Sequence, residues 1–304
     1  MLNPILSFSA TRRMRTFRMM LILLIYVLLL LGIAVWLMAP FFAGRVTLGF
    51  MTRGVTCYTV LLILQFALIV LIAPAMSSGA IAGERDRRTL ELLLVTQTGS
   101  FRIVLGKALE SFAFLALLIL CGLPVMCLCL ITGGITFTQV LLGELYLMAI
   151  AFAAVSLGVF CSTIARSTVV AAVLSYLAVM AIGAVTVLPV LTGYPQRITD
   201  KVYDPQLYAA MTPGQAFGLI HPALFLNPGY GLTALLQGQT QGLTSMIEDR
   251  GWGRLLATWL LMKKLGCTCT ALICAAVQTA VSFALLGIAA LLVRPSERRR
   301  RANG

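Results

Sequence analysis

Charged residues are scarce in this chain. Of 304 residues, 23 are Lys or Arg, ten are Asp or Glu and one is His, so charged residues make up 11% of the sequence. A soluble globular domain carries about 25%. The deficit excludes an ordinary soluble enzyme, and the 60% content of hydrophobic residues excludes a disordered chain.

The sequence also lacks the residue sets that catalysis and metal binding require. It has a single histidine, His221, no pair of acids at helical spacing inside an apolar run, and no nucleophile motif. This argues against an enzyme acting within a membrane. The eight cysteines lie in or beside apolar runs, and none has the spacing of a zinc site. We therefore expect no catalytic residues, metal or cofactor on this chain.

Residues 99–108 imitate a phosphate-binding loop without its mechanism. Six residues separate Gly99 from Gly106 where such a loop has four, and Ala108 offers no hydroxyl to magnesium. We therefore do not expect ATP to bind to this segment.

Long apolar runs are what the sequence has in abundance. Each is long enough to cross about 30 Å of hydrocarbon as a helix. They predict an all-α polytopic membrane protein, organised as a single membrane domain over residues 1–304. The six predicted transmembrane helices run from Met19 to Ala39, Val55 to Ala82, Val104 to Ile131, Phe137 to Ile164, Thr168 to Leu191 and Gly266 to Val293.

The net charge of +13 comes from basic clusters between the apolar runs. Almost no aromatic residues are interleaved with them, so we expect topology signals and no nucleic-acid partner. By the positive-inside rule the side with most of these clusters faces the cytoplasm. That places both termini in the cytoplasm of a multi-pass protein of the cell membrane. The clusters are Arg12, Arg13, Arg15 and Arg18; Arg85, Arg87, Arg88, Arg102 and Lys107; Arg166; and Arg294 with Arg298 to Arg301 in the basic tail 294–304.

The first 18 residues have the pattern of a helix lying on the membrane surface. Asn3 and Pro4 suit a helix start. Apolar side chains such as Phe8 and Phe17 can face lipid while the four arginines face headgroups. We expect a cytoplasmic amphipathic helix over 1–18; the alternative is a frayed basic tail.

Two acidic residues fall inside predicted spans, where an uncompensated charge is costly. Glu110 follows Lys107 by three residues, which predicts a structural ion pair on one helix face. Glu144 has no charged neighbour in sequence. It is a candidate for lining a transport path or binding a cationic substrate; the alternative is a polar partner on another helix.

The loop between the second and third spans is the most informative segment. Its charged start can form helical pairs at four-residue spacing, Glu84 with Arg88 and Arg87 with Glu91. A leucine-rich stretch follows, which is too apolar to sit in water alone. This pattern indicates either a docking element for another protein or a loop packed on the chain's own helix ends.

This loop closely resembles the signature of the permease subunits of type 2 ABC exporters, in which a Gly-Glu-Arg-…-Thr-Leu-Glu-x-Leu-Leu-x-Thr-Pro string precedes Leu-Gly-Lys. The chain departs from it with Arg88 where Gly is usual and Gln97 where Pro is usual. The matching residues are Gly83, Glu84, Arg85, Thr89, Leu90, Glu91, Leu93, Leu94, Thr96, Leu105, Gly106 and Lys107.

The resemblance implies an export permease that is not itself an enzyme. The loop 83–103 would contain a short cytoplasmic coupling helix held in a cleft of a separate ABC ATPase. Two ATPase copies, carrying ATP and Mg, would serve this chain and a second permease that is identical or related. The residues expected to make the ATPase contact are Glu84, Arg85, Arg88, Thr89, Leu90, Glu91, Leu93 and Leu94.

The long segment 193–265 precedes the last span and is predicted to lie outside. Its apolar stretch around Asn227 is broken by Pro222, Pro228 and Gly229, so no piece is long enough to cross a bilayer. Irregular backbone can enter a membrane only where protein or water satisfies it. Because members of the resembled family carry re-entrant helices here, we expect a re-entrant outer lid.

Three other interpretations compete with this one. An ion-coupled carrier without an ATPase would need several charges inside the membrane, and only two acids are available. A membrane-embedded enzyme would need His, Asp or paired acids around a wet cavity. A non-transporting protein of the same fold is a third alternative.

Overall fold

The computed structural model describes residues 17–42, 50–86, 100–131, 133–191, 210–220, 222–239 and 266–293. All regular structure in these ranges is helical, and no strand occurs there, which confirms the predicted all-α class. The elements are α2 (Phe17–Phe42), α3 (Phe50–Ser77), α4 (Gly79–Asp86), α6 (Ser100–Ile131), α7 (Phe137–Ile164), α8 (Thr168–Leu191), α11 (Pro213–Leu219), the 3₁₀ helix η1 (Pro222–Leu226), α12 (Pro228–Gln239) and α15 (Cys267–Val293).

Six stretches of helix in the described ranges are long and apolar enough to cross a membrane, as the sequence predicts. The fourth, α7, begins and ends at the predicted residues. Its start is fixed by a capping box, in which Thr136 and Gln139 exchange side-chain and backbone hydrogen bonds.

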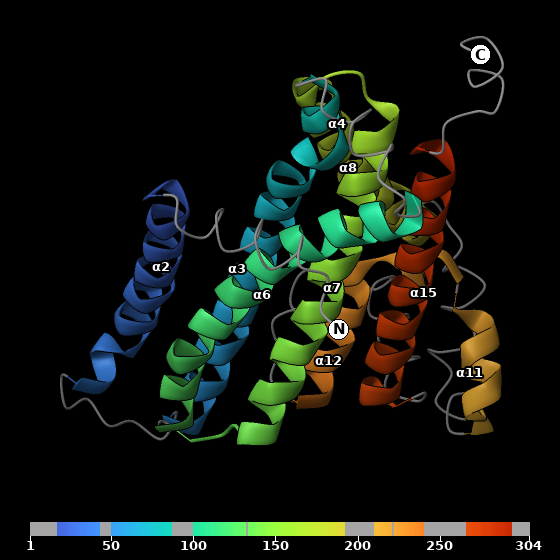
Figure 1. Cartoon of the computed structure of the whole chain (residues 1–304). Helices are drawn as coiled ribbons and strands as arrows, with labels where there is room; N and C mark the ends of the chain where they lie inside the picture. Colours follow the sequence, from blue (N-terminus) through green and yellow to red (C-terminus); the bar gives the residue numbers. More distant parts are fainter. Residues whose placement is uncertain are drawn as a thin grey trace, which may run out of the picture.

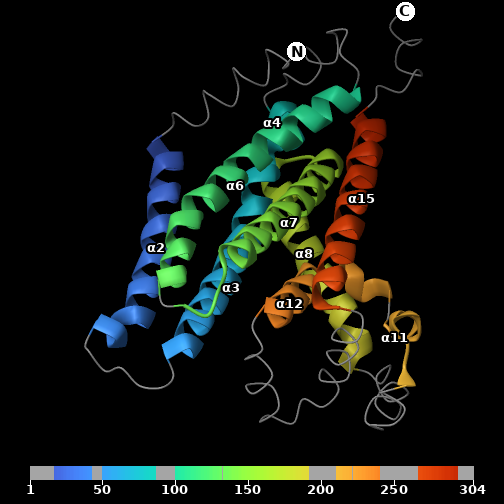
Figure 2. The ribbon, with the colours of Figure 1, turned by 90° about the horizontal axis from the view of Figure 1, so that it is seen from below.

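Helix α7 is the centre of the bundle. It packs against α15, α6, α3 and α8 among the long helices, and against α4 and α12 among the short ones. In the most apolar 18-residue stretch of α7, 56% of the residues are buried in the bundle. The corresponding share is 17% in α2 and 11% in α8. Figures 1 and 2 place α2 at one edge of the bundle, where it contacts α6 and α3. Movement of α7 would therefore displace the packing of six of the nine other described elements.

Helix α6 links both edges of the bundle. In Figure 1 it begins near α15, crosses in front of α7 and then descends beside α3. Its first turns lie at the same end of the molecule as α4, which we call the α4 end. The opposite end holds the start of α7 and the start of α15 (Figure 1).

A glycine lets α3 and α7 approach closely near the α4 end. A Cβ atom added at Gly158 would lie 1.8 Å from Ser77 Oγ and 2.9 Å from Ser77 Cβ. Small residues allow this kind of contact between membrane helices, because their backbones can come together. The contact between α3 and α7 therefore has no room for a larger side chain at Gly158.

The second predicted span, 55–82, is two helices with a break between them. Helix α3 ends at Ser77, and α4 starts at Gly79 after a turn at Ser78. Pro74 lies inside the last turn of α3 and cannot donate a helical hydrogen bond. The hydroxyl of Ser77 turns back to the Ala73 carbonyl at 2.7 Å. Continuous hydrophobicity thus hides the break at Ser78, whose carbonyl accepts a hydrogen bond from Ser162 on α7.

Several predicted elements lie outside the described residues. They are the surface helix except for its last two residues, the part of the coupling loop at 87–99, the basic tail 294–304, and the stretches 193–209 and 240–265 of the predicted outer segment.

Candidate functional site

Helix α4 meets the ends of three long helices at one buried hydroxyl. We call this region the α4 junction; it comprises Ser78, α4 and the facing ends of α6, α7 and α8. Ser162 on α7 accepts hydrogen bonds from the backbone N–H groups of Ile81 at 3.0 Å and Ala82 at 2.9 Å. It donates to the Ser78 carbonyl at 2.6 Å. The free N–H groups of a helix start need such partners, so Ser162 caps α4 from a different helix.

Two charged side chains of α4 complete its attachment to the turn between α7 and α8. The Arg85 guanidinium donates to the carbonyls of Ala165 at 2.6 Å and Thr163 at 3.1 Å, at the end of α7. Asp86 accepts from the backbone N–H of Thr168 at 3.1 Å, at the start of α8. These pairs match the partial charges of helix ends, a cation at a C-terminus and an anion at an N-terminus.

An ion-pair triad joins α4 to α6. Lys107 Nζ lies 2.9 Å from Glu84 Oε1 and 3.7 Å from Glu110 Oε2. The side chains of Lys107 and Glu84 are about a quarter exposed, whereas Glu110 is buried. The Lys107–Glu110 pair that the sequence predicts is thus part of a larger set. Because Glu84 also pairs with Lys107, the first acid of the signature holds the chain's own helices together.

The α4 junction therefore fixes one short helix to three long ones. Of the eight residues predicted to contact an ATPase, the structure brings Glu84 and Arg85 into this junction. The other six, Arg88, Thr89, Leu90, Glu91, Leu93 and Leu94, lie outside the described residues. Their part in a coupling helix stays a prediction.

Glu144 is buried on α7 and is not among the residues that line the cavity described below. Its Oε2 accepts a hydrogen bond from Gln65 Nε2 on α3 at 3.0 Å. Glu144 Oε1, Gln65 Oε1 and the Tyr26 hydroxyl have no hydrogen-bond partner among the described residues, and all three side chains are at most 4% exposed. Gln65 is thus the polar partner on another helix that the sequence analysis gave as the alternative. A place for Glu144 on the transport path stays a prediction.

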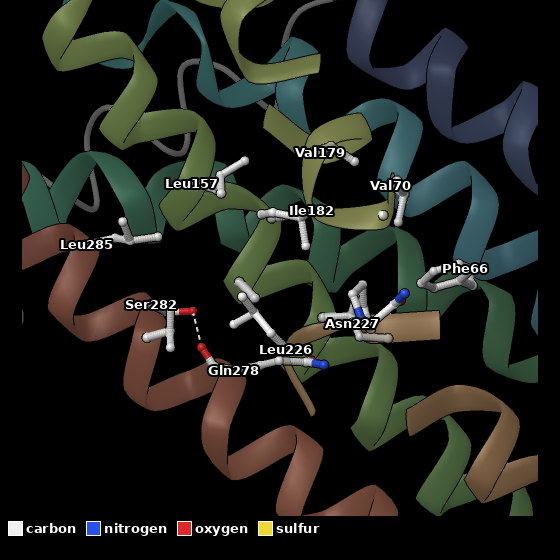
Figure 3. Close-up of a pocket in the computed structure, with 16 residues that line it drawn as sticks. Phe66, Val70, Leu157, Val179, Ile182, Leu226, Asn227, Gln278, Ser282 and Leu285 are labelled. Carbon is white, nitrogen blue, oxygen red and sulfur yellow. Dashed lines mark hydrogen bonds between the residues drawn. The ribbon is translucent and has the colours of Figure 1, made fainter. Parts of the chain in front are cut away.

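A cavity of about 230 Å³ lies on the face of α7 between α8 and α15 (Figure 3). Helix α3 contributes Phe66 and Val70 to its wall, and the turn between η1 and α12 closes one end with Leu226 and Asn227. The lining is apolar apart from a few uncharged groups. Among these, Gln278 is 3% exposed.

The predicted breaks of the outer segment are found at the ends of short helices. Pro222 begins η1, and Pro228 begins α12. Asn227 Oδ1 accepts from the Gly229 N–H at 2.8 Å, which caps the start of α12. Pro at the first helical position is favoured because its missing N–H has no partner there in any case.

The turn between η1 and α12 contacts the middle of two long helices. The Tyr146 hydroxyl donates to the Pro228 carbonyl at 3.1 Å, and Gln278 lines the same cavity as Pro228. At 1.5 Å per residue these two side chains lie about 13 Å along α7 and about 16 Å along α15 from their starts. The segment before α15 therefore reaches well into the bundle.

Sequence reasoning missed Ser162, Asp86 and Gln278. A serine or glutamine in an apolar run is a weak signal, since many such side chains bond to their own helix; Ser156 does so on α7, donating to the Phe152 carbonyl at 2.8 Å. Asp86 stands in the signature loop, yet its partner is 82 positions away. Within the described ranges, no three His, Cys, Asp or Glu side chains form a group that could hold a metal.

Comparison with known proteins agrees with the fold. The chain matches the family model described as ABC-2 family transporter protein over residues 46–293, which is most of its length and includes five of the six long helices. No curated protein matches the chain. Membrane proteins of this family work with an ABC ATPase. With its six apolar helices, the chain belongs to the ABC-2 transporter family and is a membrane permease of an ABC transporter.

Proposed function

We propose that this chain is the permease subunit of an ABC exporter and that a separate ATPase drives it from the α4 end. The observation that carries the proposal is the α4 junction. A helix of eight residues, whose last four residues begin the signature loop, is tied by Ser162, Arg85, Asp86 and Glu84 to α7, α8 and α6. A displacement applied to α4 must therefore move these helices or break several hydrogen bonds.

The proposed coupling follows from how the bonds are distributed. In the sequence, residues 87–99 lie between α4 and α6. A partner that pulls on this loop would strain the bonds of Arg85 and Asp86 to the turn between α7 and α8. It would also strain the Glu84–Lys107 pair that joins α4 to α6. Because α7 packs on six of the nine other described elements, this strain reaches the core of the bundle. ATP binding to the partner would thus shift the population of permease conformations.

The assembly proposed around this chain follows the family resemblance. Two ATPase copies would carry ATP and Mg, and a second permease, identical or related, would complete the path. The ATPase side would be cytoplasmic, with both termini of this chain on that side and the path opening outward. The chain itself would perform no chemistry, since hydrolysis takes place on the partner.

Affinity purification in mild detergent tests this proposal. We expect an ATPase with a phosphate-binding loop to co-purify with the tagged chain. A Glu84→Ala plus Leu93→Asp double variant should lose it while keeping its expression and thermal stability. Phe137→Asp is the matched control, because Phe137 is exposed at the opposite end of the molecule.

Two results would contradict the proposal. One is an ATPase that is lost equally from the Phe137→Asp control, because the contact would then not be at the α4 end. The other is a chain that purifies alone and still moves a substrate after reconstitution.

A further inference from the structure

The cavity on α7 exists because two long helices share a neighbour without packing on each other. Helices α8 and α15 both pack on α7, and η1 packs on both of them at one end. Small residues widen the space, since Ala153 and Ala154 face it from α7 and Gly183 faces it from α8. A Cβ atom added at Gly183 would meet nothing within 4 Å. The volume is thus built into the helix arrangement.

The size and lining of the cavity suit an apolar guest. Its volume is about 230 Å³, and a cavity of about 150 Å³ already binds benzene. No charged side chain is among the residues that line it. A charged group placed here would have no counter-charge, so the guest should be neutral.

Gln278 provides one polar group inside this apolar cavity. Its side-chain amide N and O both have no hydrogen-bond partner among the described residues. The Tyr146 hydroxyl interacts with that amide but lies outside hydrogen-bond geometry with it and donates to the Pro228 carbonyl. Ser282 donates to the backbone carbonyl of Gln278 at 2.6 Å, so it does not serve the side chain. Figure 3 shows the amide extending from α15 into the space beside Leu226.

A buried amide without a partner is unusual, because most buried polar groups are hydrogen-bonded. An amide is both donor and acceptor, so it can pair with a hydroxyl, a carbonyl or another amide. We propose that the cavity between α7, α8 and α15 binds one neutral amphiphile, with its apolar part against α7 and α8 and a hydroxyl, carbonyl or amide group on Gln278. This goes beyond the proposed coupling and does not depend on it.

Two sources offer this chemistry. A neutral lipid of the bilayer would stay in the cavity as part of the structure, whereas a transported amphiphile would leave it during the cycle. Both require the same site, and the second part of the experiment below separates them.

Photolabelling of the purified chain in nanodiscs tests the site without any partner. The probe is a long-chain alcohol with a diazirine on its chain, and the comparison probe is the same chain without the hydroxyl. We expect labelled peptides from α7, α8 and α15, and displacement by unlabelled alcohol. Gln278→Leu should weaken binding of the alcohol about tenfold, the loss expected for one buried hydrogen bond, and leave the hydrocarbon probe unchanged.

Gly183→Leu supplies a test that leaves Gln278 in place. The new side chain fills the cavity from α8 and should abolish labelling by both probes. Gly32→Leu is the matched control, since a Cβ atom at Gly32 on α2 also meets nothing within 4 Å and α2 does not line the cavity. This control should label like the unaltered chain.

Three results would overturn the proposal. The first is equal labelling of cavity residues and lipid-facing residues such as Leu120, unaffected by Gly183→Leu. The second is failure of Gln278→Leu to distinguish the two probes. The third is a disulfide-linked dimer of Val179→Cys that excludes the probe, because a second copy of the chain would then occupy the cavity.

Once binding is established, the assembled transporter distinguishes the sources. Release of the bound probe on addition of Mg-ATP assigns the site to cargo, and retention assigns it to a resident lipid. Either result supports the site. If no ATPase joins the chain, the proposed coupling fails while the nanodisc measurement still stands.

Discussion

The α4 junction and the middle of the bundle satisfy their polar groups in opposite ways. At the α4 junction, Ser162 makes three hydrogen bonds, and Arg85 and Asp86 each bond to the backbone at a helix end. In the middle of the bundle, Gln278 and Glu144 are buried with side-chain atoms that have no hydrogen-bond partner among the described residues.

The difference separates a part that transmits force from a part that accommodates a guest. A region with fully paired polar groups has one favoured geometry, because moving it leaves buried donors and acceptors unpaired. A region with unpaired groups gains stability when a partner arrives. The α4 junction is therefore expected to move as a unit, and the cavity to change its occupancy.

The largest contrast is expected from adding a leucine side chain at two glycines, Gly158 in the contact between α3 and α7 near the α4 end and Gly183 beside the cavity. Gly158→Leu should prevent stable folding, because its Cβ would meet Ser77 at less than van der Waals distance; overpacking of this kind costs about 3 kcal/mol or more. Gly183→Leu should fold normally. Detergent-resistant monodispersity and thermal unfolding measure both variants, and equal behaviour of the two would remove the contrast in packing.

The second prediction compares two buried serines on α7. Ser162→Ala leaves the N–H groups of Ile81 and Ala82 and the Ser78 carbonyl short of a partner, so it should cost about 2–3 kcal/mol. Ser156→Ala should cost well under about 1 kcal/mol, because Ser156 bonds only to its own helix. Thermal unfolding of the two variants measures the difference. A cost for Ser156→Ala as large as that for Ser162→Ala would contradict the cap assigned to Ser162.

A smaller effect is expected from the Glu84–Lys107 pair. Because both side chains are about a quarter exposed, a double-mutant cycle with Glu84→Gln and Lys107→Gln should give a coupling energy of at most about 1 kcal/mol for stability, reduced by salt. Transport coupled to ATP hydrolysis should fall much more than stability does. Unchanged transport in both single variants would show that the triad has only a structural role.

The smallest effect on stability is expected from Gln278→Leu. Replacing a buried amide that has no partner with an apolar side chain of similar size should change the unfolding free energy by less than about 1 kcal/mol, in either direction. Thermal unfolding without added amphiphile is the measurement. Destabilisation as large as that of Ser162→Ala would mean that Gln278 has a structural partner within the folded chain.

The sequence predicts local features of this fold well. Apolar length locates the spans, and the predicted start of α7 agrees to the residue with the observed one, where Thr136 and Gln139 form a capping box. The spacing of Lys107 and Glu110 predicts their proximity. Pairings between distant positions could not be predicted, because they depend on how the helices pack. Glu144 is joined to Gln65 across 79 positions, and Asp86 to Thr168 across 82.

The cavity could not be predicted for the same reason. Its wall combines residues from four long helices with the turn at Asn227, and each contributes an unremarkable apolar or small side chain. The break at Ser78 was missed because hydrophobicity continues across it, and the hydroxyl that stabilises it comes from Ser162.

Site-specific photocrosslinking most directly tests the claim that an ATPase drives this permease from the α4 end. A photoreactive amino acid would be placed at Leu93, in the signature loop, and in a second variant at Phe137, at the opposite end of the molecule. The account predicts a crosslink from Leu93 to an ABC ATPase that strengthens or weakens with Mg-ATP, and none from Phe137. A functional complex that crosslinks only from Phe137, or equally from both positions, would contradict it.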